Sequence, residues 1–118
     1  MTSDLRPVFV LHEHRLPRQH FDLRLEEEGV LRSWAVPKGL PTDVRRDRLA
    51  VAVADHDLDH ATYTDETKTI ADTGWWELED RTERRFVFVL HGAKGPVRYA
   101  LIDTGDDWLL HLSKKQPG

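Results

Sequence analysis

The sequence predicts an all-β fold: a small closed β-barrel of about eight short, mostly antiparallel strands with one short helical turn. Apolar residues recur with a period of two rather than 3.6 along most of the 118-residue chain, as they do in strands with one buried face. Glycine, proline and aspartate cluster between these stretches, as is typical of turns. A barrel is favoured over a sandwich because closure leaves no strand edge exposed.

The expected strands alternate apolar and polar side chains. In the second strand, Phe21 and Leu23 share one face, whereas His20, Asp22 and Arg24 share the opposite face. The expected strands are residues 7–14, 20–25, 30–36, 48–55, 75–79, 85–91, 97–103 and 108–112.

Two stretches between the strands lack this alternation. Residues 40–47 are expected to form the helical turn, with Thr42 as its N-cap, and the polar residues 57–73 are expected to form a long loop. The length fits one domain over residues 1–118. Its tails, residues 1–6 and 114–118, are expected to be flexible.

Composition excludes several classes of protein. The absence of cysteine rules out disulfide scaffolds, thiolate zinc sites and cysteine nucleophiles. No stretch approaches the roughly 20 apolar residues of a membrane span, and no signal peptide is evident, so a cytoplasmic monomer without a membrane partner is expected. The formal net charge is -4. Through Ala50 the chain has nine Lys/Arg against eight Asp/Glu, and afterwards eight against thirteen, so phosphate chemistry is expected in the first half.

A candidate metal site lies on the polar face of the second strand. His20 and Asp22 alternate on this face, and His14 ends the preceding strand after a short linker. Two imidazoles and a carboxylate on adjacent strands can bind a divalent metal and leave positions open, and such a set suits Mn²⁺, Fe²⁺, Co²⁺ or Zn²⁺. His12 is expected to be a neighbour of the site rather than a ligand. The alternative is an ordinary solvated strand face.

Basic residues that could hold a phosphoryl group accompany this site. Arg24 shares the polar face, Lys38 follows the third strand, and Arg48 and His56 share a face if their strand is unbroken. His56 could orient phosphate or protonate a leaving oxygen, and the two flanking aspartates would raise its pKa if they lie close. The alternative for each cation is a solvated surface charge.

Five motifs occur in an order that matches a known family: FVLHEH (9–14), RQHFDLRLE (18–26), SWAVPKG (33–39), RLAV (48–51) and DH (55–56). With these motifs the sequence resembles the 3'-phosphoesterase domain attached to bacterial DNA ligase D, in its stand-alone form. The resemblance is dense over residues 7–60 and looser over residues 86–114.

The resemblance implies a Mn²⁺-dependent β-barrel enzyme that heals DNA 3' ends during end-joining repair, with Co²⁺ or Zn²⁺ as alternative ions. Such an enzyme removes a 3'-phosphate, and also a terminal 3' ribonucleoside, to leave a 3'-OH. Its substrates would be DNA or RNA-tipped DNA 3' ends, and separate end-joining ligase and polymerase proteins would be its partners. Position by position, the implied metal ligands are His14, His20 and Asp22, and the residues implied to hold or activate the scissile phosphate are Arg24, Lys38, Arg48 and His56.

The sequence also departs from the family pattern. The family often has glutamine at the position of His12, glutamate at Ala54 and tyrosine near His60, and its glycine-rich segment is replaced here by residues 65–73. Its charged N-terminal extension is not matched by the residues before Pro7. We therefore expect the phosphomonoesterase step to be kept and the phosphodiesterase step to be weak. The alternative functions are a non-catalytic nucleic-acid end-binding module and a hydrolase of small phosphate esters.

Overall fold

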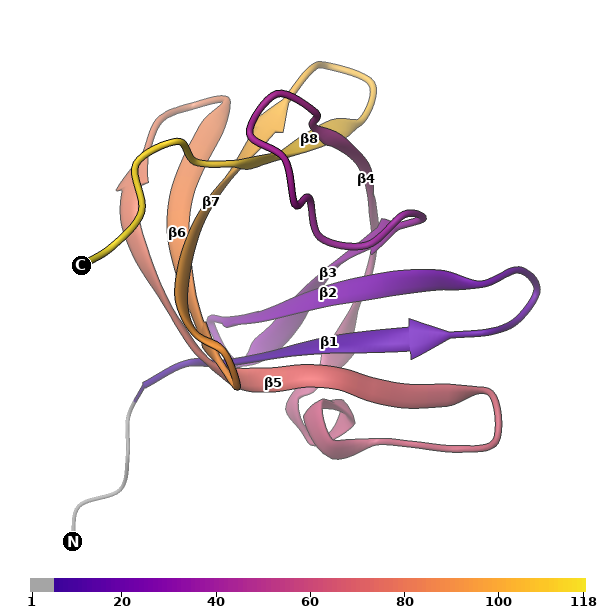
Figure 1. Cartoon of the computed structure of the whole chain (residues 1–118). Coiled ribbons are helices and arrows are strands. Elements are labelled where there is room, and N and C mark those ends of the chain that lie inside the picture. The colour runs from indigo at the N-terminus through magenta and orange to yellow at the C-terminus, as the bar shows by residue number, and fades with distance from the viewer. Residues whose placement is uncertain (1–5) are drawn as a thin grey trace, which may run out of the picture.

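The computed structural model describes residues 6–118, and in this range eight strands close into an antiparallel barrel (Figure 1). The order around the barrel is β1-β2-β3-β4-β8-β7-β6-β5, which confirms the all-β barrel predicted from the sequence. The strands are β1 (Val8–His14), β2 (His20–Glu27), β3 (Val30–Val36), β4 (Arg48–Asp57), β5 (Lys68–Arg81), β6 (Arg85–Gly92), β7 (Gly95–Asp103) and β8 (Trp108–Leu112). Most of the tail expected at residues 1–6 lies outside the described residues.

The helical turn occurs at a different place from the one expected. It is a 3₁₀ helix, η1 (Leu58–Thr62), in the segment that the sequence suggested was a loop. Residues 40–47 contain a hydrogen-bonded turn instead. In that turn the carboxylate of Asp43, rather than the side chain of Thr42, accepts a hydrogen bond from the backbone N–H of Arg45 (2.9 Å).

Strand β5 is also longer than expected, because its 14 residues begin at Lys68 rather than near Trp75. Its first half alternates between more and less exposed residues, but one face carries threonine and alanine and the other mixes apolar and charged residues. The alternation of hydrophobicity along this half of β5 is therefore weak, although the alternation of exposure is clear in the structure. This half of β5 pairs with β1 and brings Lys68 directly opposite His14.

The barrel encloses an apolar core, and one part of its outer wall is buried as well. Trp34 is the largest fully buried side chain, and every strand contributes to the core. On β1, β2 and β3 the residues that alternate with core residues point outward, yet four polar ones are also buried: His12, Asp22, Arg24 and Ser33. Helix η1 and the residues after it cover this wall, against the side of the barrel (Figure 1).

Strand β4 contains a bulge opposite β3. Ser33 pairs with Val53 and Leu31 pairs with His56, so two steps along β3 correspond to three along β4. The extra residue turns His56 to the outer wall, whereas Arg48 stays on the opposite face of the strand. The expectation that Arg48 and His56 share a face, which required an unbroken strand, is therefore wrong.

The C-terminal residues lie against β7. The side-chain amide of Gln116 donates a hydrogen bond to the carbonyl oxygen of Arg98 (3.0 Å), and the backbone N–H of Arg98 donates to Oε1 of Gln116 (2.7 Å). In the described part of the chain, no helix has the length and hydrophobicity needed to cross a membrane.

Candidate metal and phosphate site

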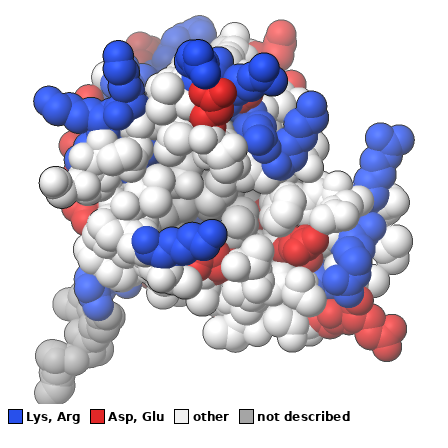
Figure 2. Space-filling model, in the orientation of Figure 1, with Lys and Arg blue, Asp and Glu red and all other residues white. Residues whose placement is uncertain are grey.

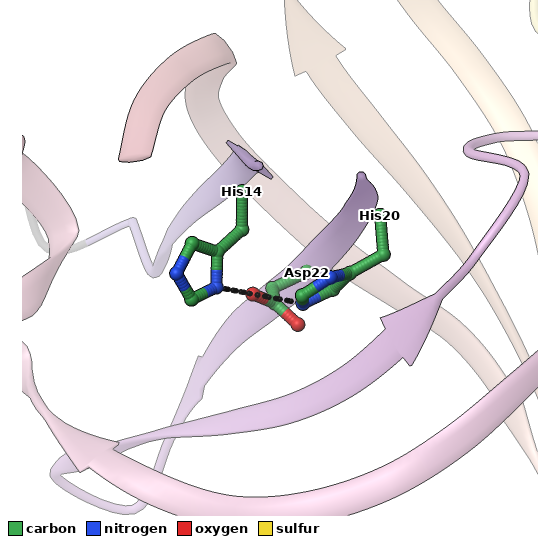
Figure 3. Close-up of side chains that lie close together, drawn as sticks. All are labelled: His14, His20 and Asp22. Carbon is green, nitrogen blue, oxygen red and sulfur yellow. Dashed lines mark ion pairs between the residues drawn. The ribbon is translucent and has the colours of Figure 1, made fainter. Parts of the chain in front are cut away.

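Two histidines and one aspartate converge at the loop that joins the end of β1 to the start of β2. His14 and His20 pair across the two strands, and their rings lie on either side of the Asp22 carboxylate (Figure 3). Oδ2 of Asp22 is 3.4 Å from Nε2 of His20 and 3.9 Å from Nδ1 of His14. One ligand atom from each residue lies within 4.8 Å of the others. The structure thus brings together the three residues that the sequence suggested as metal ligands.

The donor set fits a divalent metal ion. Nδ1–H of His20 donates a hydrogen bond to the carbonyl oxygen of Arg18 (2.9 Å), which leaves the lone pair of Nε2 free on the side of Asp22. Burial, followed by the charge of Lys68, lowers the pKa of His14, which favours the neutral imidazole that a metal requires. Two imidazole nitrogens and a carboxylate oxygen suit a transition metal better than Ca²⁺.

Arg24 is buried beside Asp22 and is held by three hydrogen bonds. Its Nε donates to Nδ1 of His12 (3.1 Å), and its two terminal nitrogens donate to Oγ of Ser33 (2.9 Å) and to Oδ2 of Asp22 (3.3 Å). Only 2% of the residue is exposed. Three of the five guanidinium N–H groups are therefore used inside the protein, and Arg24 orients the carboxylate of Asp22.

His12 connects this buried layer to the segment that covers it. Because its Nδ1 accepts a hydrogen bond from Arg24, its Nε2 carries the proton and donates to the carbonyl oxygen of Tyr63 (2.9 Å). Burial lowers the pKa of His12, in keeping with a neutral ring. Both ring nitrogens are engaged, so His12 is a neighbour of the site rather than a ligand.

Three aromatic rings stack beside the site. His56 and His60 lie 4.1 Å apart and His60 and Tyr63 lie 4.8 Å apart, with interplanar angles of 13° in both pairs. Burial, followed by the nearby His56, lowers the pKa of His60 to about 4. Nε2 of His60 therefore accepts a hydrogen bond from the ammonium group of Lys68 at 3.2 Å.

The pKa of His56 shifts in the direction opposite to the one expected from its neighbours in sequence. Burial lowers this pKa, and the charges of Arg24 and Lys68 lower it further. The charge of Asp57 acts in the expected direction, but burial and the two cations outweigh it. His56 is therefore a neutral imidazole within electrostatic reach of the site.

Two further predicted phosphate-binding residues, Lys38 and Arg48, contact each other just beyond the end of β3, which pairs with the start of β2. The guanidinium group of Arg48 donates a hydrogen bond to the carbonyl oxygen of Lys38, and both residues line a cavity of about 290 Å³. Within residues 6–118, no hydrogen bond or ion pair joins either of them to the three candidate metal ligands.

The sequence did not indicate that Lys68 lies beside the candidate site. This residue is 9% exposed and lies directly across from His14 in the β1–β5 pairing. It falls in the segment interpreted as a loop, where the residues alternate in exposure in the structure but only weakly in hydrophobicity. Its neighbour His14 is distant in sequence, so the pairing leaves no local pattern.

This barrel and its polar outer wall correspond to a known class of phosphoesterase domains. The sequence pattern of the DNA Ligase D 3'-phosphoesterase domain matches residues 12–103, a range that contains the candidate metal ligands and their buried neighbours. The chain belongs to this family of DNA ligase D 3'-phosphoesterase domains. Membership implies phosphoesterase activity.

Relatives of the chain include three bacterial proteins named multifunctional non-homologous end joining protein LigD. The protein from Mycobacterium bovis is 40% identical over 123 residues and that from Mycolicibacterium smegmatis is 39% identical over 129, each alignment covering 92% of this chain. The protein from Pseudomonas aeruginosa is 37% identical over 125 residues, covering 90% of this chain. The alignments span only 16%, 17% and 15% of these relatives, respectively.

Proposed function

We propose that this protein is a Mn²⁺-dependent phosphoesterase that heals DNA 3' ends in end-joining repair by removing a 3'-phosphate to leave a 3'-OH. The observation that carries the proposal is the convergence of His14, His20 and Asp22 within 4.8 Å on a barrel of this family. A divalent ion bound by these residues would polarise the phosphoryl oxygens and offset the charge that develops on them.

The surrounding residues have distinct roles in this proposal. Arg24 holds the carboxylate of Asp22 in place and adds a buried positive charge close to the phosphate. His56 is neutral in the free protein, and a bound phosphate dianion would raise its pKa. It would then protonate the 3' oxygen as the bond from phosphorus to that oxygen breaks and a water oxygen bonds to phosphorus, which releases inorganic phosphate. Lys38 and Arg48 would bind a phosphate of the substrate strand.

Positive charge on the protein surface supports local rather than general recognition of nucleic acid. Figure 2 shows lysine and arginine side chains in several groups, mostly toward the edges of this face, with acidic groups between them and no continuous basic surface. The formal net charge of -4 agrees with this distribution. We therefore infer that the enzyme recognises the 3' end at the site instead of binding along a duplex.

The experiment that tests this proposal uses a labelled primer–template that ends in either a 3'-phosphate or a single 3' ribonucleotide. With Mn²⁺, the wild-type protein should release phosphate and His20→Ala should lose this activity. His91→Ala should keep it, because His91 pairs with Trp75, which lies opposite Val8 at the other end of β1 from His14. The ribonucleotide should react more slowly, because residues 65–73 differ from the glycine-rich segment of the family. Equal rates on the two ends would contradict this preference.

A second candidate is a non-catalytic module that binds nucleic-acid ends. Ala54 favours it, because this exposed residue lies in the β4 bulge at a position where the family often has glutamate. A folded wild-type protein that binds the 3'-phosphate end but releases no phosphate with Mn²⁺ would support this candidate. A hydrolase of small phosphate esters would instead act equally on a nucleoside 3'-phosphate and on the oligonucleotide.

A further inference from the structure

Lys68 is a buried cation that has no carboxylate partner in residues 6–118. Only 9% of the residue is exposed. Its ammonium group makes one hydrogen bond, to Nε2 of His60 at 3.2 Å, and lies over the Tyr63 ring, 5.5 Å from its centroid. An ammonium group has three donors, so two remain for another acceptor. Buried charges in proteins are normally paired, because the loss of hydration is otherwise uncompensated. A lysine in this position therefore points to an anion that is supplied from outside the protein.

The position of Lys68 in the sheet directs it toward the candidate metal site. Lys68 and His14 pair directly across β1 and β5, so their side chains extend from the same face of the sheet. The charge of Lys68 lowers the pKa values of His14 and His56, which places its ammonium group within electrostatic reach of both rings. Lys68 thus adds a positive charge to the wall that holds Asp22 and Arg24.

Arg24, the other buried cation of this wall, has only two guanidinium N–H groups left for an anion. Arg24 uses three of its N–H groups on protein acceptors, and one N–H of Arg48 is used on the carbonyl oxygen of Lys38. Around the site, the two buried cations Arg24 and Lys68 face the single buried carboxylate of Asp22. This excess of positive charge suits a phosphate, whose free oxygens need donors.

The segment before β5 fixes Lys68 in place. Oδ1 of Asp65 accepts hydrogen bonds from the backbone N–H groups of Thr67 (2.8 Å) and Lys68 (2.9 Å), and Oδ2 of Asp65 accepts one from the Tyr63 hydroxyl (2.6 Å). The carboxylate of Asp65 is thus used to shape the chain and makes no ion pair with the ammonium group. The backbone of Lys68 is fixed while its charge stays available.

We propose that Lys68 is a phosphate-binding residue of the candidate site, where its ammonium group donates hydrogen bonds to an oxygen of the phosphate held beside His14, His20 and Asp22. The identity of the anion rests on the proposed function, whereas the anion-binding role of Lys68 does not. Lys68 lies outside the set of phosphate-binding residues expected from the sequence.

The test measures binding of inorganic phosphate and of Mn²⁺ separately, by calorimetry on Lys68→Met. Methionine keeps a similar side-chain length without the charge, and Lys94→Met, in the exposed turn between β6 and β7, is the matched control. In the presence of Mn²⁺, phosphate should bind about tenfold or more weakly to Lys68→Met, as expected for loss of a hydrogen bond from a charged group. Mn²⁺ itself should bind as tightly or more tightly, because a nearby positive charge is gone. Lys68→Arg should restore part of the phosphate affinity.

A purely structural role for Lys68 predicts a different pattern. If Lys68 only supports His60 and the covering segment, Lys68→Met should weaken Mn²⁺ and phosphate together, and Lys68→Arg should not restore phosphate binding selectively. Unchanged phosphate affinity in a folded Lys68→Met protein would overturn the proposal. If Lys68→Met does not fold, the proposal can be tested on the wild-type protein with isotope-labelled lysines. In NMR spectra, the Lys68 ammonium signal should shift when phosphate is added, and the Lys94 signal should not. The absence of a Lys68 shift at a saturating phosphate concentration would also overturn it.

These measurements separate this proposal from the proposed function. If the wild-type protein releases no phosphate from a DNA 3' end but binds inorganic phosphate in a Lys68-dependent way, the nucleic-acid assignment fails and the role of Lys68 stands. If the enzyme acts on DNA ends with equal KM values in wild type and Lys68→Met, the assignment stands and the role of Lys68 fails.

Discussion

The guanidinium group of Arg24 lies 3.3 Å from Oδ2 of Asp22, two residues earlier on the same face of β2. The same carboxylate oxygen is the one nearest to His14 and His20. One oxygen therefore links the half-buried rings of His14 and His20 to a buried layer of polar residues. The position of Asp22 depends on hydrogen bonds that continue into the outer wall of the barrel.

Replacement of Arg24 should destabilise the fold strongly. Arg24→Met removes the only cation that is hydrogen-bonded to Asp22 among the described residues, and it also leaves His12 and Ser33 without a donor. Loss of one partner of a buried ion pair costs about 3–5 kcal/mol. Urea unfolding measures this difference. Arg45→Met is the control, because the Arg45 side chain is 86% exposed and its removal should change stability by less than about 0.5 kcal/mol. Similar losses in the two variants would contradict the buried role of Arg24.

Mn²⁺ should stabilise the protein against heat through the three candidate ligands. A ligand that binds only the folded state stabilises it by about 2.7 kcal/mol at a concentration of 100 times its Kd. Tm should therefore rise with Mn²⁺ concentration in the wild type, as measured by calorimetry. It should not rise in His20→Ala, which lacks one ligand, and should rise normally in His91→Ala. An equal rise in His20→Ala would place the metal elsewhere.

Without metal, the protein should lose stability as the pH falls from about 6.5 to 4. The pKa of His60 is lowered to about 4 in the folded protein, so protons bind to the unfolded chain first. The stability contributed by the neutral ring is present above the unfolded pKa and is lost as the pH falls through the folded pKa. The loss for this ring alone is on the order of 3 kcal/mol at pH 4. Urea unfolding between pH 7 and pH 4 measures it.

The matched variant for the pH series is His60→Phe, which keeps an aromatic ring but cannot take up a proton. Its stability should fall less steeply than that of the wild type over the same pH range. The pKa values of His12 and His56 are also lowered by burial, so part of the pH dependence should remain. Parallel curves for the two proteins would show that His60 does not contribute.

Gly74 should not tolerate a larger side chain, because β5 and β6 approach closely at this residue. A Cβ atom at Gly74 would lie 1.9 Å from the carbonyl oxygen of His91, so the two strands would have to move apart. Overpacking of this kind costs about 1–3 kcal/mol or more. Thermal unfolding of Gly74→Ala should show a Tm lower by several degrees, and an unchanged Tm would contradict the close approach.

Most strands and the three candidate metal ligands could be predicted from the sequence because both depend on local patterns. Alternation of apolar residues defined the strands with one buried face. His14 and His20 lie in consecutive strands joined by a short loop, so their proximity follows from the hairpin itself. Asp22 follows at the spacing that keeps it on the same face as His20.

The features that were missed depend on pairings between distant segments. The bulge in β4 adds one residue without any change in hydrophobicity, so the orientation of His56 could not be read from its spacing to Arg48. Burial then reversed the expected pKa shift of His56. Lys68 was missed because its place beside His14 requires β5 to pair with β1, and the polar first half of β5 carries only a weak strand pattern.

The strand order has a consequence for how the site assembles during folding. The three candidate metal ligands belong to one hairpin, β1–β2, which needs only a short loop to close. Lys68 reaches them only when β5 adds to β1, and the barrel closes only when β4 pairs with β8. Longer loops carry a larger entropic cost of closure and form later. The first hairpin therefore brings the candidate ligands near one another, whereas Arg24 needs Ser33 of β3 to hold Asp22 in place and Lys68 joins only when β5 has been added.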